Sequence, residues 1–367
     1  MATLLHVIDT TGPGGAETIF IELADRLRAR GHKSIVTVRG EGWVADTLRQ
    51  RGLDPIVLDC KGSFNLKFLY QLHRLVKVHK VDLVQSHLLG SNVYCGLLGL
   101  LTGVPVVGTF HGVVDVSPDE RFTGLKLKVM NVGLSRFVSV CQGLADAIAE
   151  RGLLNLEKTQ VIYNGVDIPR YANAADQNLR ARLGLPEDAL LAGCLGNIRP
   201  AKAYDVLIKA LPAVLEQYPN FHVAVAGHAK GPLQQELEDL ATSLGVRDHI
   251  HFLGFCNDSA GHLASIDYFL LPSRSEGFPV SLIEALSANL PIIATRCVGT
   301  EEILEHGVNG WLIEPENVDV LSDALIKMLA KDPVMPDWSQ QVQAAERFSM
   351  ESMLDDYEAL YQSVAKR

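Results

Sequence analysis

Residues 268–284 read YFLLPSRSEGFPVSLIE, and this stretch decides the fold. Four apolar residues, Tyr268–Leu271, predict a buried strand, turn-forming residues follow in 272–279, and the apolar spacing in Val280–Ser287 predicts a helix. The loop therefore brings a helix N-terminus to the carboxyl end of a strand. In an open parallel sheet, ligands bind at that edge, where the unpaired amides of a first helical turn attract phosphate or sugar oxygens.

Strands alternate with helices along the rest of the chain. Apolar runs predict strands at residues 4–8, 34–38, 55–58, 83–86, 104–110, 190–195, 221–226, 249–253 and 291–294, and periodic patterns predict helices between them, as at 43–50 and 66–79. Such alternation builds right-handed parallel units of a doubly wound sheet. We therefore predict an α/β fold of two Rossmann-like doubly wound domains that face each other across a cleft.

The length of the chain, 367 residues, suits two domains of ordinary size. We predict an N-terminal domain at residues 1–168 and a C-terminal domain at 169–349, with the polar stretch Ile168–Gln177 as the linker. Apolar residues at helical spacing end the chain and predict a helix, 350–367, that crosses back to the N-terminal domain.

Composition and charge exclude several classes of protein. Hydrophobic residues make up 47% and charged residues 21%, which excludes a disordered chain. Residues 1–170 hold 19 Lys and Arg against 16 Asp and Glu, whereas the remainder holds 14 against 27. The first half would tolerate an anionic surface and the second would be repelled by one, and no nucleic acid partner is expected.

The cysteine pattern and the first residues indicate the compartment. The six cysteines form no CxxC pair, so neither a disulfide framework nor a zinc site is predicted. Residues 1–9 lack a signal-peptide pattern, and we expect a cytoplasmic protein that can work at the inner face of the membrane. The uncharged segment Leu83–Val114 is interrupted by glycines and Pro105, so it predicts a buried helix, a turn and a strand rather than a membrane span.

Two carboxylates, Glu276 and Glu284, lie eight positions apart in the opening stretch. Either can be an ordinary surface residue, but the small or rigid residues around Glu276 let a ligand approach the backbone closely. A carboxylate accepts hydrogen bonds from sugar hydroxyls, and Glu284 has two oxygens for a ribose diol. The pair therefore favours a polar ligand such as a nucleotide sugar.

Two cations, Arg199 and Lys202, follow the predicted strand 190–195. They are either solvated residues of a first helical turn or phosphate ligands. Cations at a helix N-terminus oppose the macrodipole, so their presence requires a reason. Arginine grips phosphate with two donors and lysine acts as a mobile point charge, which favours a diphosphate at this strand end.

A glycine-rich turn and a histidine end two strands of the first half. Gly12–Gly15 reads GPGG, which lacks the spacing of a dinucleotide fingerprint, and no acidic residue ends the second strand, so a dehydrogenase is excluded. His111 follows the strand 104–110 and is either a structural histidine or a ligand contact at the cleft.

These residues resemble the retaining nucleotide-sugar glycosyltransferases of family 4, including those of bacterial cell-surface and exopolysaccharide synthesis, which have the GT-B fold. The resemblance covers nearly the whole chain and rests on the glutamate pair of residues 276–284. Supporting motifs are GGAE (14–17), TFHG (109–112), YNGVD (163–167), FLG (252–254), VGTEEI (298–303) and a GVNGWL hairpin (307–312).

The resemblance implies a role for each of these residues. Glu276 and His111 would contact the donor sugar, Arg199 and Lys202 the diphosphate, and Glu284 the ribose. The remaining predicted donor-binding residues are Gly14, Gly15, Asn197, Phe255, Gly277, Phe278, Pro279, Val280 and Ser281. Asn197 stands where the family often has its arginine, Ala203 replaces a frequent glycine, and residues 227–229 depart from the usual GxG turn.

The resemblance also implies a reaction. A hexosyl or N-acetylhexosaminyl group would pass, with retention, from a nucleoside-diphosphate sugar, UDP-linked above all, to a hydroxyl of a glycan or lipid-linked acceptor. No DxD-type aspartate pair ends a strand, so no metal and no other cofactor is expected. An epimerase, or a nucleotide-sugar-binding protein without turnover, remains an alternative.

Apolar and basic residues alternate in 115–137, which is either an ordinary amphipathic helix at the acceptor cleft or a contact with anionic membrane.

Overall fold

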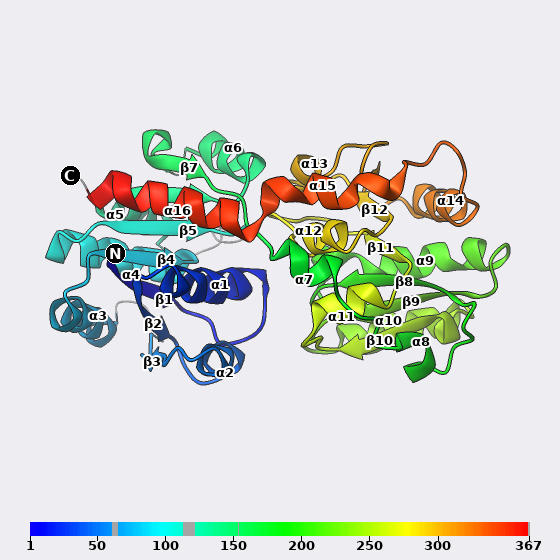
Figure 1. The fold of residues 1–367 in the computed structure, drawn as a ribbon, viewed down its shortest axis with the longest axis horizontal. Coiled ribbons are helices and arrows are strands. Elements are labelled where there is room, and N and C mark those ends of the chain that lie inside the picture. The colour runs from blue at the N-terminus through cyan, green and yellow to red at the C-terminus, as the bar shows by residue number, and fades with distance from the viewer. Residues whose placement is uncertain (61–64, 113–121, 153, 366–367) are drawn as a thin grey trace. The chain divides into compact units, whose positions relative to one another are not determined.

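The computed structural model describes residues 1–60, 65–112, 122–152 and 154–365. The chain forms two compact units, the first made of Met1–Gly165 and Glu351–Arg367, and the second of Val166–Met350. Each unit is a parallel α/β sheet (Figure 1), so the predicted pair of Rossmann-like domains is confirmed. The unit boundary lies three residues before the predicted one.

Unit 1 is built on a seven-stranded parallel sheet with the order β3-β2-β1-β4-β5-β6-β7. Its strands are β1 (Thr3–Ile8), β2 (Lys33–Val38), β3 (Ile56–Val57), β4 (Leu83–His87), β5 (Val106–Phe110), β6 (Arg136–Ser139) and β7 (Thr159–Val161). Its helices are α1 (Gly15–Ala29), α2 (Trp43–Gln50), α3 (Leu66–His79), α4 (Leu89–Thr102), α5 (Thr123–Gly133), α6 (Gln142–Glu150) and α16 (Met350–Ala365). The sheet order reverses between β1 and β4, so a crevice is expected beside the loops that follow these two strands.

Unit 2 repeats this order in a six-stranded parallel sheet, β10-β9-β8-β11-β12-β13. Its strands are β8 (Leu190–Leu195), β9 (Phe221–Ala226), β10 (Ile250–Gly254), β11 (Tyr268–Leu271), β12 (Ile292–Thr295) and β13 (Trp311–Ile313). The helices are α7 (Ile168–Ala172), α8 (Leu179–Arg182), α9 (Tyr204–Leu215), α10 (Leu233–Ser243), α11 (Ser259–Ala264), α12 (Val280–Ser287), α13 (Thr300–Ile303), α14 (Val318–Leu329) and α15 (Gln341–Ala345). Here β8 and β11 flank the reversal of strand order.

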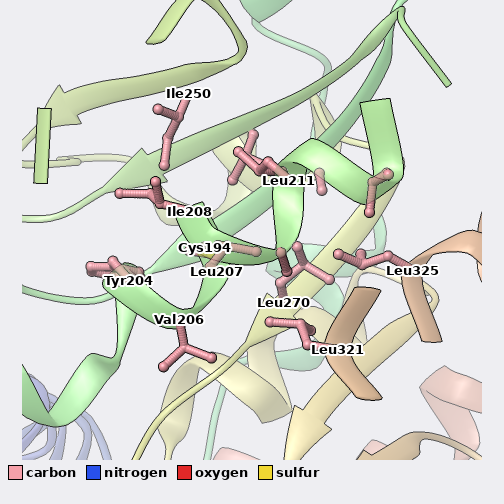
Figure 2. Packing of buried hydrophobic residues seen from close by; sticks show 14 of the residues in the cluster. Cys194, Tyr204, Val206, Leu207, Ile208, Leu211, Ile250, Leu270, Leu321 and Leu325 are labelled. Carbon is pink, nitrogen blue, oxygen red and sulfur yellow. The ribbon is translucent and has the colours of Figure 1, made fainter. Parts of the chain in front are cut away.

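The core of unit 2 lies between α9, α14 and the sheet. Leu207, Ile208 and Leu211 of α9 are fully buried and pack with Leu270 of β11 and Leu325 of α14. Figure 2 shows these side chains converging on α9. The helix is thereby fixed against the strands, which holds the loop before it, residues 196–203, over the sheet edge.

Two expectations about local structure are wrong. The polar stretch Ile168–Gln177 is not simply a linker, because it contains α7, where Pro169 begins the helix and Tyr171 is buried. Residues 307–312 are not a hairpin, since Gly307 donates to the carbonyl of Gly310 in a turn and the following strand pairs parallel with β12. A 3₁₀ helix, Pro200–Lys202, precedes α9 in the loop after β8.

The uncharged segment of unit 1 folds as α4 and β5, both packed within the unit. In the described part of the chain, no helix is long and apolar enough to cross a membrane. All six cysteines are free thiols. Of the segment 115–137, residues 115–121 lie outside the described residues, and the rest holds α5.

Candidate functional site

The loops after β8 and β11 bring a cation and a carboxylate together at the carboxyl edge of the unit 2 sheet. The Nζ of Lys202 lies 2.7 Å from Oε1 of Glu276, and Oγ of Ser273 donates to the same oxygen at 2.5 Å. Both charged side chains are mostly buried, at 18% and 12% exposed. The carboxylate is therefore held in one orientation while its second oxygen, Oε2, is not used by either of these bonds.

Close backbone contacts explain how these loops meet. A Cβ on Gly227 would lie 2.0 Å from the carbonyl oxygen of Gly196, so the loops after β8 and β9 touch backbone to backbone. Gly299 has a φ of +79°, and a Cβ there would lie 2.2 Å from the carbonyl of Gly277. Only glycine fits at these two positions, because a side chain at either one would push the neighbouring strand-end loops apart.

Glu284 lies on α12, one helix turn beyond the loop that carries Glu276. Its Oε1 accepts a 2.6 Å hydrogen bond from the hydroxyl of Tyr171 on α7, which also lies 3.0 Å from Oγ of Ser259. Glu284 is 8% exposed, and burial raises its pKa above the usual range, although the bond from Tyr171 acts to lower it. Burial also raises the pKa of Tyr171 far above normal, so Tyr171 remains a hydrogen-bond donor at neutral pH.

Asn197 has a structural contact inside the predicted site. Its Oδ1 accepts from the backbone amide of His228 at 3.0 Å, and the amide of Ile198 donates to the carbonyl of His228 at 2.9 Å. The asparagine therefore ties the loop after β8 to the loop after β9. It stands where an arginine was expected from the family pattern, and it stabilises the loop that carries Lys202.

The structure does not bring Arg199 into contact with the carboxylates. Arg199 is exposed, and among the described residues its side chain makes no hydrogen bond or ion pair. Arg274, in the loop after β11, forms ion pairs instead, and it was not among the residues predicted from the sequence. It donates to Asp205 at 2.8 Å and to the carbonyl of Pro200 at 2.7 Å, and it also pairs with Glu316.

The predicted donor-binding residues 277–281 surround the start of α12. Phe278 is buried, with its ring 5.5 Å from the ring of Phe348, and Pro279 is the N-cap residue of the helix. Val280 and Ser281 form the first helical turn, whose amides are the unpaired donors of the helix. Phe255 follows β10 and is 37% exposed, an unusual position for a large aromatic ring.

Gly14 and Gly15 lie in unit 1, at the start of α1. Gly14 is the N-cap residue of this helix and Gly15 is its first residue. A Cβ on Gly14 would lie 2.3 Å from Oε2 of Glu17, so the carboxylate of Glu17 folds back over the loop. This helix N-terminus at the carboxyl end of β1 has no side-chain cap hydrogen bond, and its amides suit an anionic group.

His111 also lies in unit 1, directly after β5. Its Nε2 is 2.9 Å from Nδ1 of His87, and the two rings stack with centroids 5.2 Å apart. Desolvation lowers the pKa of His111 to about 3 and lowers that of His87 well below its usual value. Both imidazoles are therefore neutral at physiological pH, and His111 is suited to hydrogen bonding rather than to ion pairing.

The sequence analysis missed Tyr171, Ser273, Arg274 and His87. His87 directly follows the predicted strand 83–86, and Ser273 lies two residues after the predicted strand 268–271, so their positions in the sequence could have indicated both residues. Tyr171 and Arg274 had no such signal, because their partners come from distant parts of the chain. In the described ranges, no three His, Cys, Asp or Glu side chains are grouped so as to hold a metal ion.

Two family models match the chain, one in each half. Residues 13–170 match the model "Glycosyltransferase Family 4", and residues 175–345 match "Glycosyl transferases group 1". The second match contains Lys202, Glu276 and Glu284, and the first contains Gly14, Gly15 and His111.

Curated relatives and solved structures have similar length. The chain is 27% identical to the Escherichia coli UDP-Gal:alpha-D-GlcNAc-diphosphoundecaprenol alpha-1,3-galactosyltransferase over 72% of this chain and 70% of that protein. It is 26% identical to a D-inositol 3-phosphate glycosyltransferase of Thermobifida fusca, over 96% and 89% of the two chains. The Anabaena protein HepE in complex with UDP superposes with a TM-score of 0.85 at 25% identity, over 98% of this chain and all of that one.

These relatives are named as glycosyltransferases, which does not favour an epimerase. Together the two family models cover residues 13–170 and 175–345, and the HepE structure shares the arrangement of both sheets. The chain belongs to the GT-B glycosyltransferases of the group 1 and family 4 type, which act on nucleotide sugars.

Proposed function

We propose that this chain transfers a hexosyl or N-acetylhexosaminyl group from a UDP-linked sugar to a hydroxyl of a glycan or lipid-linked acceptor, with retention and without a metal ion. The observation that carries the proposal is the triad of Lys202, Glu276 and Ser273 at the carboxyl edge of the unit 2 sheet. It combines a mostly buried cation with a carboxylate of fixed orientation beside a helix N-terminus.

Each group of this site has a part in the proposed reaction. Lys202 neutralises the charge that develops on the departing diphosphate, and the amides at the start of α12 add partial positive charge. Glu276 accepts hydrogen bonds from the sugar hydroxyls, and Glu284 accepts them from the ribose. Neither glutamate transfers a proton, since a leaving phosphate oxygen takes the proton of the acceptor hydroxyl.

Arg199 is proposed to act only once a ligand is bound. Its exposed side chain has the length to turn towards a diphosphate near Lys202, three residues further along the chain. Because no hydrogen bond or ion pair with the described residues orients its side chain, we assign Arg199 a smaller share of the charge stabilisation than Lys202. Arg274 is proposed to hold the loop rather than the ligand, since its donors already have protein partners.

The nature of the donor is supported by the relatives. HepE was solved with UDP and, in another structure at 23% identity, with UDP-glucose, and the Escherichia coli relative is named for UDP-galactose and a lipid-linked diphosphate acceptor. We infer from these names a uridine nucleotide as the first candidate for this chain.

Transfer with retention is tested on the reaction product. UDP-glucose and UDP-galactose are incubated with undecaprenyl-diphosphate N-acetylglucosamine as the acceptor, with and without EDTA, and the anomeric proton of the product is observed by NMR. We expect an α-linked product from these α-linked donors, at the same rate with EDTA. A β-linked product would rule out retention, and a rate restored only by added Mg²⁺ or Mn²⁺ would rule out the metal-free reaction. UDP release without acceptor, with an epimerised sugar, would point to the epimerase.

We also propose that α5 contacts an anionic membrane near the acceptor. Phe122, Leu125 and Val132 are exposed by 56%, 51% and 61%, and Lys126 and Lys128 lie between them. Exposed apolar residues beside lysines are typical of helices that rest in a lipid interface.

Liposome flotation tests this contact. Vesicles containing phosphatidylglycerol should carry the parent protein but carry less of the Lys126→Glu/Lys128→Glu variant, because each lysine near an anionic surface contributes about 1 kcal/mol. The matched control reverses Lys209 and Lys327, which lie in unit 2. Equal flotation of the parent and the α5 variant would remove the membrane from the proposal.

A further inference from the structure

A buried network of hydrogen bonds supports the loop that carries Glu276. Strand β12 pairs parallel with β11, so its last residue, Thr295, lies beside the start of the loop after β11. The hydroxyl of Thr295 donates to the carbonyl oxygen of Ser273 at 2.5 Å, and the thiol of Cys297 donates to the same oxygen at 3.3 Å. A second contact of the Thr295 hydroxyl, with the carbonyl of Leu271, is longer, at 3.3 Å. A carbonyl oxygen has two lone pairs, so the chain segment at the end of β12 fills both acceptor positions of Ser273.

Thr300 closes this segment into a turn. Its hydroxyl oxygen accepts from the backbone amide of Cys297 at 2.8 Å, and it lies 2.7 Å from the carbonyl of Cys297 and 2.9 Å from that of Thr295. The backbone amide of Thr300 also donates to the carbonyl of Cys297, at 3.1 Å. The turn therefore fixes the thiol of Cys297 in its position against the loop after β11.

The turn 295–300 contacts the loop after β11 on both sides of Glu276. Ser273, three residues before Glu276, is held by the two hydrogen bonds to its carbonyl, and Gly277, the next residue, lies against Gly299. The hydroxyl of Ser273 donates in turn to Oε1 of Glu276 at 2.5 Å. The turn thus fixes the backbone from which the carboxylate and its donor both extend.

Water cannot replace these hydrogen bonds, because Ser273, Thr295 and Thr300 are fully buried or nearly so, at 0%, 2% and 0% exposed. Loss of one donor leaves the buried carbonyl of Ser273 short of a partner, which costs free energy unless the loop rearranges to pair it again. Such a rearrangement moves the hydroxyl of Ser273, and the carboxylate of Glu276 then loses its fixed orientation.

We propose that Thr295, Cys297 and Thr300 are positioning residues for the donor sugar. They hold Ser273 in place, and Ser273 in turn orients Glu276 so that its second oxygen, Oε2, meets a sugar hydroxyl. The role of Glu276 towards the sugar rests on the proposed function, whereas the support of the loop rests on the buried hydrogen bonds alone.

The binding of UDP and of UDP-sugars separates positioning from stability. Lys202 is proposed to bind the diphosphate, which UDP and a UDP-sugar have in common, whereas Glu276 is proposed to bind only the sugar. A displaced Glu276 therefore weakens the binding of a UDP-sugar more than the binding of UDP. A general loss of stability lowers both affinities alike, so the ratio of the two dissociation constants reports the orientation of Glu276.

Calorimetric titration of the full chain with UDP, UDP-glucose and UDP-galactose measures this ratio. Thr295→Val removes the hydroxyl and keeps the shape of the side chain. In this variant the Kd of the better-bound UDP-sugar, relative to that of UDP, should rise about tenfold, as expected for one misdirected hydrogen bond of a charged group. Thr295→Ser supplies a hydroxyl again and should restore the parent ratio. Thr37→Val is the matched control, because the buried hydroxyl of Thr37 donates to the carbonyl of His6 in unit 1 and has no link to Glu276.

Two further variants make the test independent of one substitution. Cys297→Ala removes the weaker donor, a thiol, and should raise the same ratio about threefold. It decides the question if Thr295→Val does not fold. In a Glu276→Ala background, Thr295→Val should leave the ratio unchanged, because the carboxylate through which it acts is absent.

The outcomes distinguish this inference from the proposed function. If Glu276→Ala raises the ratio but Thr295→Val and Cys297→Ala keep the parent ratio, the positioning role is overturned and the proposed function stands. A rise that persists in the Glu276→Ala background also overturns it, since the effect then does not pass through the carboxylate. If Glu276→Ala itself keeps the parent ratio, or if the parent binds neither UDP nor a UDP-sugar, the proposed function fails and the positioning role fails with it.

Discussion

At the scale of single residues, the site depends on carboxylates whose directions are fixed by neighbours. Ser273 and Lys202 hold one oxygen of Glu276, and Tyr171 holds one oxygen of Glu284. A carboxylate with one oxygen committed to the protein can direct the other towards a ligand hydroxyl without the entropy cost of ordering a free side chain. In the proposed reaction, these contacts are thus oriented before the donor binds.

Removal of the Tyr171 hydroxyl should affect Glu284 in a pH-dependent way. The bond from Tyr171 opposes the burial that raises the pKa of Glu284, so Tyr171→Phe should raise this pKa further. If the ionised carboxylate accepts from the ribose, UDP binding is lost as the pH falls through the pKa of Glu284, and the loss should begin at a higher pH in the variant.

Calorimetric titration of UDP between pH 5 and pH 8 measures this shift. The variant should also lose about 1 kcal/mol of stability, the typical value of one buried hydrogen bond. Tyr218→Phe is the control, because Tyr218 lies in the same unit but is not bonded to Glu284. Identical pH profiles for Tyr171→Phe and the parent would show that Tyr171 does not tune Glu284.

At the scale of elements, the periodicity of apolar residues predicted most helices and strands. The elements that it did not predict depend on contacts with residues distant in the sequence. The helices Trp43–Gln50, Leu66–His79 and Val280–Ser287 have the predicted bounds, since each has an amphipathic or apolar pattern of its own. The short helix α7 was missed because five residues carry too little periodicity, and its burial depends on α11 and α12. The 3₁₀ helix before α9 likewise has no pattern that distinguishes it from a first helical turn.

The end of the chain is attached to unit 1 by an ion cluster that can be tested. Arg30 of α1 pairs with Glu351, Asp355 and Glu358 of α16, and Glu358 also lies 2.9 Å from Nε2 of His32. Arg30→Ala should lower the free energy of unfolding by about 1 kcal/mol, because the cluster shares one cation among three partly exposed carboxylates.

Thermal unfolding at low and high salt checks this prediction. The effect of Arg30→Ala should shrink at 1 M NaCl, since salt screens exposed charges. Arg49→Ala, which removes an exposed pair with Glu41 on α2, should change the melting temperature little. A salt-independent loss in Arg30→Ala would mean that packing, and not charge, attaches α16.

At the scale of the whole molecule, the sequence predicted the two sheets because strands and helices alternate in a fixed order. The contacts of the site could be predicted only in part. The family resemblance assigned Glu276 and Lys202 to one donor site, and in the structure the two side chains are in contact after β11 and β8, the strands that flank the reversal of sheet order. Two other contacts could not be predicted, the bond from Tyr171 to Glu284 and the ion pair of Arg274 with Asp205. Each joins residues more than 65 positions apart in the sequence, and residue spacing gives no signal for side-chain packing over such a separation.

The central claim is that the carboxyl edge of unit 2 holds the nucleotide sugar, and ligand-dependent thermal stabilisation tests it most directly. A panel of UDP-, GDP- and ADP-sugars is measured with the parent and with Lys202→Ala, Glu284→Ala and the control Lys209→Ala. We expect a UDP-sugar to raise the melting temperature of the parent and of Lys209→Ala, and to raise that of the two site variants much less. If the best ligand of the panel stabilises Lys202→Ala and Glu284→Ala as much as the parent, the donor site does not lie at these residues.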